Sequence, residues 1–155
     1  MKALLIHDGF FPHGSAFASR LTNMARLFVS IGYEVHIIAA YTKELGLNRN
    51  EIQTLEDFSF QISDIYNRGS IDSFVGPKFF WNDVREYIDS NNIDVVFSSS
   101  GQTYFEKLLR LCRSKRILCL VEQCEWLDIS AFKFGKIDPR YIKMNALFNK
   151  GYQAR

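Results

Sequence analysis

Six polar or aromatic residues stand just beyond apolar runs of this sequence, where the carboxyl ends of buried strands are expected. They are His13, Ser99, Gln102, Glu122, Glu125 and Trp126. In an open parallel sheet, ligands bind outside the carboxyl ends of the strands. Carboxylates, hydroxyls and amides can bind the hydroxyls of a sugar, and an aromatic face can stack on a sugar ring. These six residues are therefore the candidate substrate-binding set, and no residue is predicted to be catalytic.

Ordinary structural roles remain open for the same residues. Ser99 and Gln102 can act as helix caps, because short polar side chains bond to nearby backbone groups. The two glutamates can be surface acids, and the tryptophan can belong to the core. His7 ends the first apolar run and is predicted to be a core residue with its hydrogen bonds satisfied. His13 lies in the following loop, where it can touch a ligand.

The loop from Asp8 to Ser15 joins the first apolar run to a predicted helix. A helix N-terminus favours an anion, because it carries free N–H groups and the positive end of the dipole. Gly14 lets the backbone approach a ligand closely, and Ser15 is a candidate N-cap. The alternative is that Gly9 and Gly14 only permit a tight turn. The dinucleotide fingerprint and the phosphate-binding lysine loop are both absent from the sequence.

The periodicity of apolar residues predicts the elements that hold these side chains. Short apolar runs indicate buried strands, and apolar residues three or four apart indicate amphipathic helices. A surface loop is expected at residues 71–76, with Pro77 at the first position of a helix. The alternation of strands and helices predicts a doubly wound α/β fold. The predicted strands are 3–6, 35–40, 58–62, 93–97 and 117–121, and the predicted helices are 16–31, 77–90, 103–116 and 139–150.

Length and composition narrow the possible classes. The chain has 155 residues, is 47% hydrophobic and carries a net charge of +2. These values fit one globular domain, and they do not suggest a nucleic-acid-binding protein. No apolar run reaches the length of about 18 residues that a membrane span needs, and no export leader is recognisable. The cysteines Cys112, Cys119 and Cys124 lack metal-site spacing, so we expect reduced thiols, no metal and a cytoplasmic location.

The segment 132–155 is basic, and it begins with alternating aromatic and basic residues at 132–136. It carries six Lys or Arg residues and one acid, Asp138. A basic, aromatic segment can lie on an anionic membrane surface, which would place the protein at the inner face of the membrane. The alternative is a solvated basic helix that contacts no membrane.

The order of the motifs resembles one protein family. The opening segment, 2–40, contains an apolar strand, an aromatic-proline loop, a helix, and then Gly32-Tyr33-Glu34-Val35 leading into another strand. This order is similar to the N-terminal domain of retaining family-4-like glycosyltransferases with the GT-B fold. The segments 93–97 and 125–141 look like further parts of that domain. The resemblance therefore covers nearly the whole chain.

The resemblance implies a Rossmann-like three-layer α/β/α sandwich with a mostly parallel sheet, spanning residues 1–155 as one domain. It implies the acceptor-side half of an enzyme that moves a sugar from a nucleotide-sugar co-substrate to a glycan or lipid-linked acceptor in surface polysaccharide synthesis. The partner would be a C-terminal donor-binding domain, which this sequence lacks, and no cofactor is expected for this half alone. Gly14 and Ser15 would contact the donor phosphates when the two domains close.

One position departs from the family pattern. The family often places a histidine after the strand that here ends at Val121, where this chain has Glu122 and Gln123. No catalytic histidine is therefore carried over from the family. Because the donor-binding domain is missing, we expect the chain to be inactive alone. Two other functions remain open: a self-contained nucleotide- or phosphate-binding module that uses the loop 8–15, and a docking domain that meets a membrane or a protein through its C-terminal segment.

Overall fold

The computed structural model describes residues 1–13, 16–41, 50–63, 72–99, 104–122, 134–137, 141–142 and 145. In these ranges the chain forms a six-stranded sheet with the strand order β3-β4-β2-β1-β5-β6. Neighbouring strands pair in parallel except β3 and β4, which form an antiparallel hairpin. The strands are β1 (Lys2–Phe10), β2 (Glu34–Tyr41), β3 (Gln53–Leu55), β4 (Phe58–Ile62), β5 (Val95–Ser99) and β6 (Leu118–Glu122).

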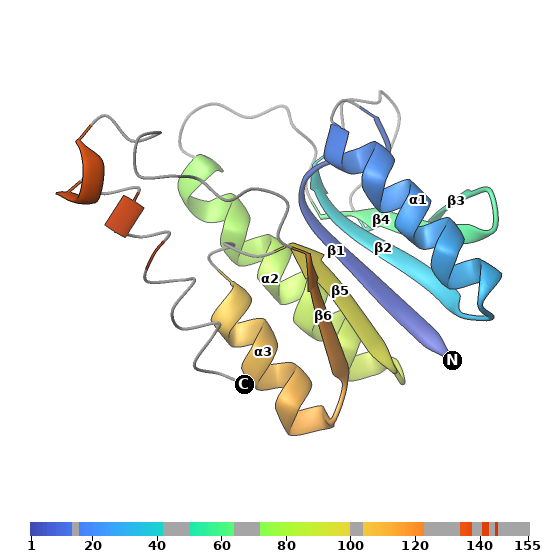
Figure 1. The fold of residues 1–155 in the computed structure, drawn as a ribbon. Helices are drawn as coiled ribbons and strands as arrows, with labels where there is room; N and C mark the ends of the chain where they lie inside the picture. Colours follow the sequence, from blue (N-terminus) through green and yellow to red (C-terminus); the bar gives the residue numbers. More distant parts are fainter. Residues whose placement is uncertain are drawn as a thin grey trace.

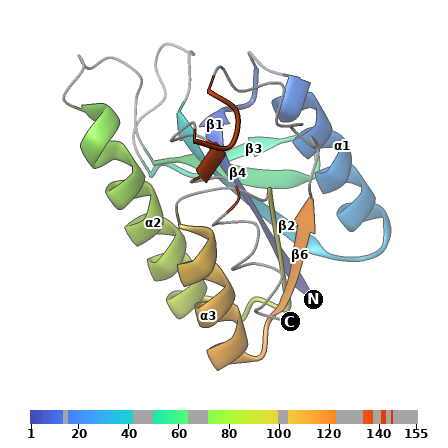
Figure 2. The same ribbon diagram turned by 60° about the vertical axis from the view of Figure 1, so that its left-hand side comes forward.

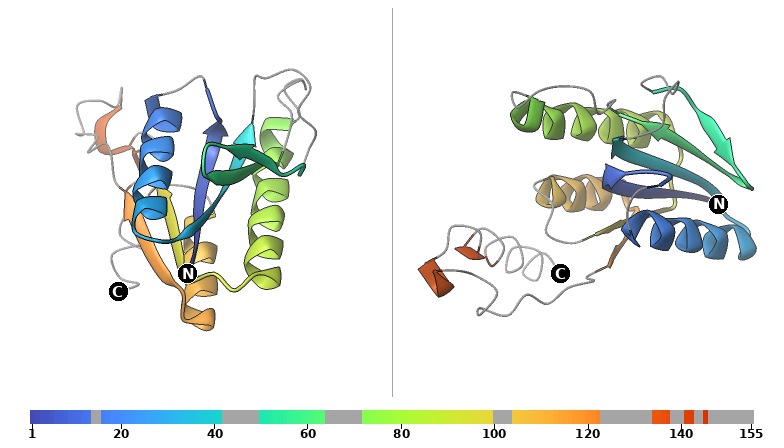
Figure 3. Two further views of the ribbon diagram at one scale, coloured as in Figure 1. Left: turned by 90° about the vertical axis from the view of Figure 1, so that its right-hand side faces the viewer. Right: turned by 90° about the horizontal axis from the view of Figure 1, so that it is seen from above.

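Three α-helices cover the two faces of this sheet. They are α1 (Ala16–Ser30), α2 (Asp72–Ser90) and α3 (Phe105–Lys115), and a short 3-10 helix, η2, spans Gly135–Ile137. Helix α1 lies on one face, and α2 and α3 lie on the other (Figures 1 and 2). The view from above in Figure 3 separates these layers plainly. The predicted Rossmann-like α/β/α sandwich with a mostly parallel sheet is confirmed.

The central strand β1 sends its apolar side chains alternately to the two faces. Ala3 and Leu5 join the cluster under α1, whereas Leu4 and Ile6 join the cluster under α2 and α3. All four are at most 1% exposed. A parallel strand that is covered on both faces reads as a continuous apolar run, which is why this strand was visible in the sequence.

Helix α1 forms where a helix was predicted, over Ala16–Ser30 against the predicted range 16–31. Leu21 and Phe28 are buried in the cluster that α1 shares with the sheet. The helix stops before Gly32, which has a φ of +89° and donates its N–H to the carbonyl of Val29 at 2.9 Å. Glycine adopts this left-handed conformation at little cost. Ile31, the last residue of the predicted helix 16–31, lies beyond the end of α1 and is 58% exposed.

Several predicted boundaries are wrong. Helix α2 begins at Asp72, so residues 72–76 are helical rather than a surface loop, and Pro77 lies inside the helix. Proline there removes one backbone hydrogen bond without ending the helix. The first strand continues to Phe10 instead of ending at residue 6, and β5 and β6 lie one or two residues later than predicted.

Strand β6 was predicted to be buried, but it is an exposed edge strand. Leu118 and Leu120 are 59% and 38% exposed. Their register partners in β5, Val95 and Phe97, are buried beneath α1. In the described part of the chain, no helix covers β6 on the α1 face, so these leucines remain open. The predicted helix 139–150 falls mostly outside the described residues, although 141–142 and 145 are helical.

Candidate functional site

The candidate site lies at the carboxyl edge of the sheet, at the last residues of β1, which follow its buried apolar run. The backbone N–H of Phe11, just after the strand, donates to the carbonyl of Tyr41 at 2.9 Å. The Phe11 side chain is fully buried, and its ring meets the ring of Phe60 edge to face, with the centroids 5.2 Å apart. This anchor fixes the path of the chain as it leaves β1, and so it fixes the positions of His7, Asp8 and Gly9.

His7 points to the α1 face of the edge. Its ring stacks on Phe17 of α1 with a centroid distance of 4.4 Å, and only 7% of the residue is exposed. Burial lowers the pKa of His7 to about 4, against a smaller opposing effect of the Phe10 backbone. The imidazole is therefore neutral at physiological pH. Among the described residues, neither ring nitrogen has a hydrogen-bond partner of good geometry, so the predicted burial is confirmed and the predicted satisfaction is wrong.

Gly9 leaves the space that the His7 ring occupies. A Cβ atom at Gly9 would lie 2.5 Å from His7 Nε2 and 2.6 Å from His7 Cε1. Such distances are shorter than any ordinary contact, so the glycine permits a close approach of backbone and ring. The sequence analysis offered a tight turn as the alternative role of Gly9. The structure places Gly9 inside β1 and gives it this packing role instead.

An ion pair links α1 to the end of β6 on the same face. Arg20 Nη1 lies 3.3 Å from Glu122 Oε1. The Arg20 guanidinium also lies over the Phe17 ring, with its carbon 5.8 Å from the centroid. Glu122, Arg20, Phe17 and His7 thus form a continuous row across the α1 side of the edge. The contact with Arg20 places the Glu122 carboxylate at this end of the row.

A second group lies on the opposite face of the same edge. Asp8 is half-buried at the end of β1, and Ser98 of β5 is fully buried. Tyr104, just before α3, is buried with its hydroxyl beside Ser98. Burial, assisted by the nearby charge of Asp8, raises the pKa of Tyr104, so its hydroxyl stays protonated. On this face the half-buried Asp8 carboxyl is the accessible group, and the two hydroxyl residues are buried near it.

Burial also raises the pKa of Asp8 to about 6, opposed in part by a hydrogen bond to its own backbone. Its ordinary value is 3.8. Between these two pH values the folded chain binds more protons than the unfolded chain, so the free energy of unfolding falls as the pH rises. The penalty is complete above pH ~6. At neutral pH, Asp8 is a carboxylate whose burial lowers the free energy of unfolding, and it is able to accept a proton.

Replacing Asp8 by asparagine is therefore expected to stabilise the protein at pH 7.5. The expected gain is about 1–2 kcal/mol, which allows for partial solvent screening of a shift in which each pKa unit corresponds to ~1.4 kcal/mol. The gain should vanish near pH 3.5. Urea denaturation at the two pH values measures it. The exposed Asp57→Asn in the β3–β4 hairpin is the matched control, and an Asp8→Asn variant no more stable than the parent at pH 7.5 would contradict the assignment.

The structure brings together only some of the predicted site residues. Ser99 and Glu122 are register partners at the ends of β5 and β6, so they share the carboxyl edge. His13 is exposed, two residues beyond the buried Phe11. The other predicted residues lie outside the described part of the chain: Gln102, Glu125, Trp126, Gly14 and Ser15.

Five residues of this edge were not predicted from the sequence. They are Asp8, Phe17, Arg20, Ser98 and Tyr104. A signal existed for Asp8, because an acid directly after an apolar run is at the carboxyl edge if the strand extends that far. No signal existed for Tyr104, because its place beside Ser98 depends on how α3 packs against β5.

Comparisons with known proteins add no assignment to this geometry. No family model and no curated protein matches the chain. Among the described residues, no group of three or more His, Cys, Asp or Glu side chains can hold a metal ion. In the same part of the chain, no helix has both the length and the apolar character to cross a membrane.

Proposed function

We propose that this chain is the acceptor-side domain of a glycosyltransferase with two facing Rossmann-like domains. In this proposal the domain holds a glycan or lipid-linked acceptor at its carboxyl edge. A donor-binding domain supplies the nucleotide-sugar, and the reaction belongs to surface polysaccharide synthesis at the cytoplasmic side of the membrane. The proposal combines the sequence resemblance with the chemistry of the edge residues.

The observation that carries the proposal is the charge and hydrogen-bonding character of the described edge. Asp8 and Glu122 are acids, Ser98 and Tyr104 are hydroxyls, His7 is neutral, and the single cation, Arg20, is engaged by Glu122. A diphosphate needs unengaged cations or backbone N–H groups. A hydroxyl-rich acceptor needs acceptors and donors of the kind present here. The described side chains of the edge therefore suit a sugar acceptor better than a diphosphate, and only the N–H groups at the start of α1 favour a phosphate.

Asp8 has a defined part in this proposal. As a carboxylate above pH ~6 it is available to accept the proton of an acceptor hydroxyl, because general bases work best with a pKa near the working pH. His7 would contribute an uncharged hydrogen-bonding group on the other side of β1. Exposed apolar side chains near the C-terminal end, at Phe134, Ile137 and Ile142, favour a membrane-bound acceptor.

The chain alone is expected to transfer no sugar, because the donor phosphates require a second domain. Radiolabelled nucleotide-sugars incubated with the chain and a panel of glycan acceptors test this expectation. Fusion of a GT-B donor-binding domain after Arg155 should produce transfer, and Asp8→Asn in the fusion should lower it by about 10²-fold or more. Transfer by the unfused chain would contradict the proposal.

A rival function is a self-contained nucleotide- or phosphate-binding module. It is favoured by one feature, the passage of β1 through a short loop into α1. The two readings differ in what the isolated chain binds. Tight binding of a nucleoside diphosphate, measured by titration calorimetry, would support the rival and count against an acceptor-side domain.

A further inference from the structure

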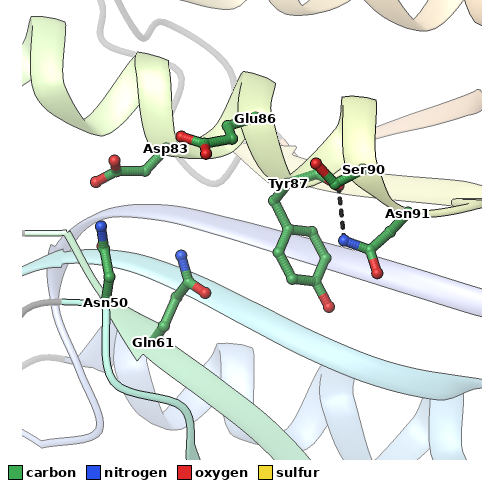
Figure 4. A pocket seen from close by; sticks show the side chains of 7 residues that line it. All are labelled: Asn50, Gln61, Asp83, Glu86, Tyr87, Ser90 and Asn91. Carbon is green, nitrogen blue, oxygen red and sulfur yellow. Dashed lines mark hydrogen bonds between the residues drawn. The ribbon is translucent and has the colours of Figure 1, made fainter.

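A polar pocket lies between α2 and β4, on the face of the sheet opposite α1. It has a volume of about 220 Å³. None of its lining residues belongs to the carboxyl-edge site. Figure 4 shows them, from β4, α2 and the segments flanking these elements: Asn50, Gln61, Asp83, Glu86, Tyr87, Ser90 and Asn91.

One wall of the pocket is a polar stripe on α2. Asp83, Glu86 and Ser90 are three and four residues apart, so they lie on one face of the helix. Asp83 is only 7% exposed, which is unusual for a carboxylate. At the end of the stripe, the Asn91 amide donates to the Tyr87 carbonyl at 2.9 Å and holds the helix end in place. This wall presents hydrogen-bond acceptors.

The wall opposite α2 presents side-chain amide donors, and a contact with His36 orients the amide of Gln61. His36 of β2 is 5% exposed, and its ring stacks on Tyr87 with the centroids 4.3 Å apart and the planes 9° apart. Burial lowers the pKa of His36 to about 4, so the ring carries one N–H. Its Nδ1 lies 2.7 Å from Ser59 Oγ, and its Nε2 lies 3.2 Å from Gln61 Oε1.

Because Gln61 presents its carbonyl oxygen, which only accepts, the His36 Nε2–H donates to it. Nδ1 is then an acceptor for the Ser59 hydroxyl, which also lies 3.4 Å from the Val35 carbonyl oxygen. Gln61 is 7% exposed, and Figure 4 shows its amide nitrogen pointing toward α2. The Gln61 amide nitrogen is thus placed to donate a hydrogen bond to a ligand in the pocket.

Asn50 completes the donor wall. It adopts a left-handed conformation, with a φ of +57°, which asparagine tolerates better than most residues. Its backbone N–H donates to the Ile62 carbonyl at 2.9 Å, which ties it to the end of β4. In Figure 4 its side-chain nitrogen points toward the helix that carries Asp83. Backbone geometry thus holds a second amide donor beside Gln61.

We propose that this pocket binds one neutral monosaccharide ring. The pocket has no Lys, Arg or His in its lining and two carboxylates, so it disfavours an anion. Its inward-facing amide donors disfavour a simple cation. Donors on one wall and acceptors on the other suit hydroxyls, because each hydroxyl both donates and accepts. The volume corresponds to about seven waters at ~30 Å³ each, which fits one small polar ring.

The site is independent of the proposed function, because it does not use the carboxyl edge. Two-dimensional 1H–15N NMR of the full chain tests it, since the side-chain amides of Asn50, Gln61 and Asn91 give their own signals. The probes are glucose, galactose, mannose and N-acetylglucosamine, with butylamine and inorganic phosphate as comparison ligands. At least one sugar should shift the Asn50 and Gln61 amide signals saturably, and phosphate should not.

Two variants sharpen the test. Glu86→Gln removes an exposed carboxylate of the helix wall, so the fold is retained, and the sugar affinity should fall about tenfold, as expected for a hydrogen bond to a charged group. Glu106→Gln on α3, outside the pocket, should leave the affinity unchanged. Three outcomes would overturn the proposal: no saturable shift with any sugar, saturation by butylamine alone, or unchanged affinity in Glu86→Gln.

Discussion

Replacing Phe11 by alanine is expected to destabilise the protein by about 3–5 kcal/mol, because the change leaves a cavity where a fully buried ring was. The ring packs edge to face on Phe60, and the Phe11 backbone holds the Tyr41 carbonyl. Aromatic pairs of this kind contribute beyond their buried area. Urea denaturation followed by circular dichroism measures the change in the free energy of unfolding.

The matched control is Phe134→Ala, because Phe134 is 59% exposed. Its change should stay within about 0.5 kcal/mol. The carboxyl edge gives a second readout, because Phe11 fixes the path of the chain after β1. The stacking of His7 on Phe17 should loosen in Phe11→Ala, and the pKa of His7 should move from about 4 toward its ordinary value of 6.5. A cost near that of the control would contradict the anchoring role.

Replacing Gly9 by alanine is expected to destabilise the protein by about 1–3 kcal/mol, as overpacking of a well-filled site does. The new methyl group would lie 2.5 Å from His7 Nε2. The His7 ring cannot yield easily, because it stacks on Phe17 and is 7% exposed. Without this ring, alanine would be the better strand residue by about 0.5–1 kcal/mol, because glycine loses more backbone freedom on folding. The His7 ring therefore turns Gly9→Ala from a stabilising into a destabilising substitution.

A double-mutant cycle with His7→Ala isolates this contact. In the His7→Ala background, Gly9→Ala should cost nothing or should stabilise slightly. Thermal unfolding of the four proteins measures the coupling. Equal costs of Gly9→Ala in the two backgrounds would show that the strain lies in the backbone rather than between Gly9 and His7.

The positions of most strands and helices could be predicted from the sequence better than how those elements are covered. Apolar periodicity located β2, β4 and α1 because their buried faces follow local spacing. It misjudged β6, because an apolar run does not reveal whether a helix lies over it. It also placed the start of α2 at Pro77, although a proline in the early turns only removes one hydrogen bond.

The candidate sites show the same limit. Glu122 was recognised because it directly follows an apolar run, and its position at the carboxyl edge is confirmed. Its pairing with Arg20 could not be predicted, because 102 residues separate the two in sequence. The orientation of the Gln61 amide depends on its contact with His36, whose ring stacks on Tyr87. Sequence periodicity carries no information about such a stack.

The most direct test of the central claim is to map what the carboxyl edge binds. Backbone NMR signals of the full chain would be followed during titration with hexose and N-acetylhexosamine disaccharides, and separately with uridine, guanosine and thymidine diphosphate sugars. We predict that a disaccharide shifts the signals of His7, Asp8 and Ser98 saturably, that Asp8→Asn weakens this response, and that no nucleotide-sugar saturates these signals. Saturation of the edge by a nucleotide-sugar, with no response to any glycan, would contradict an acceptor-side domain.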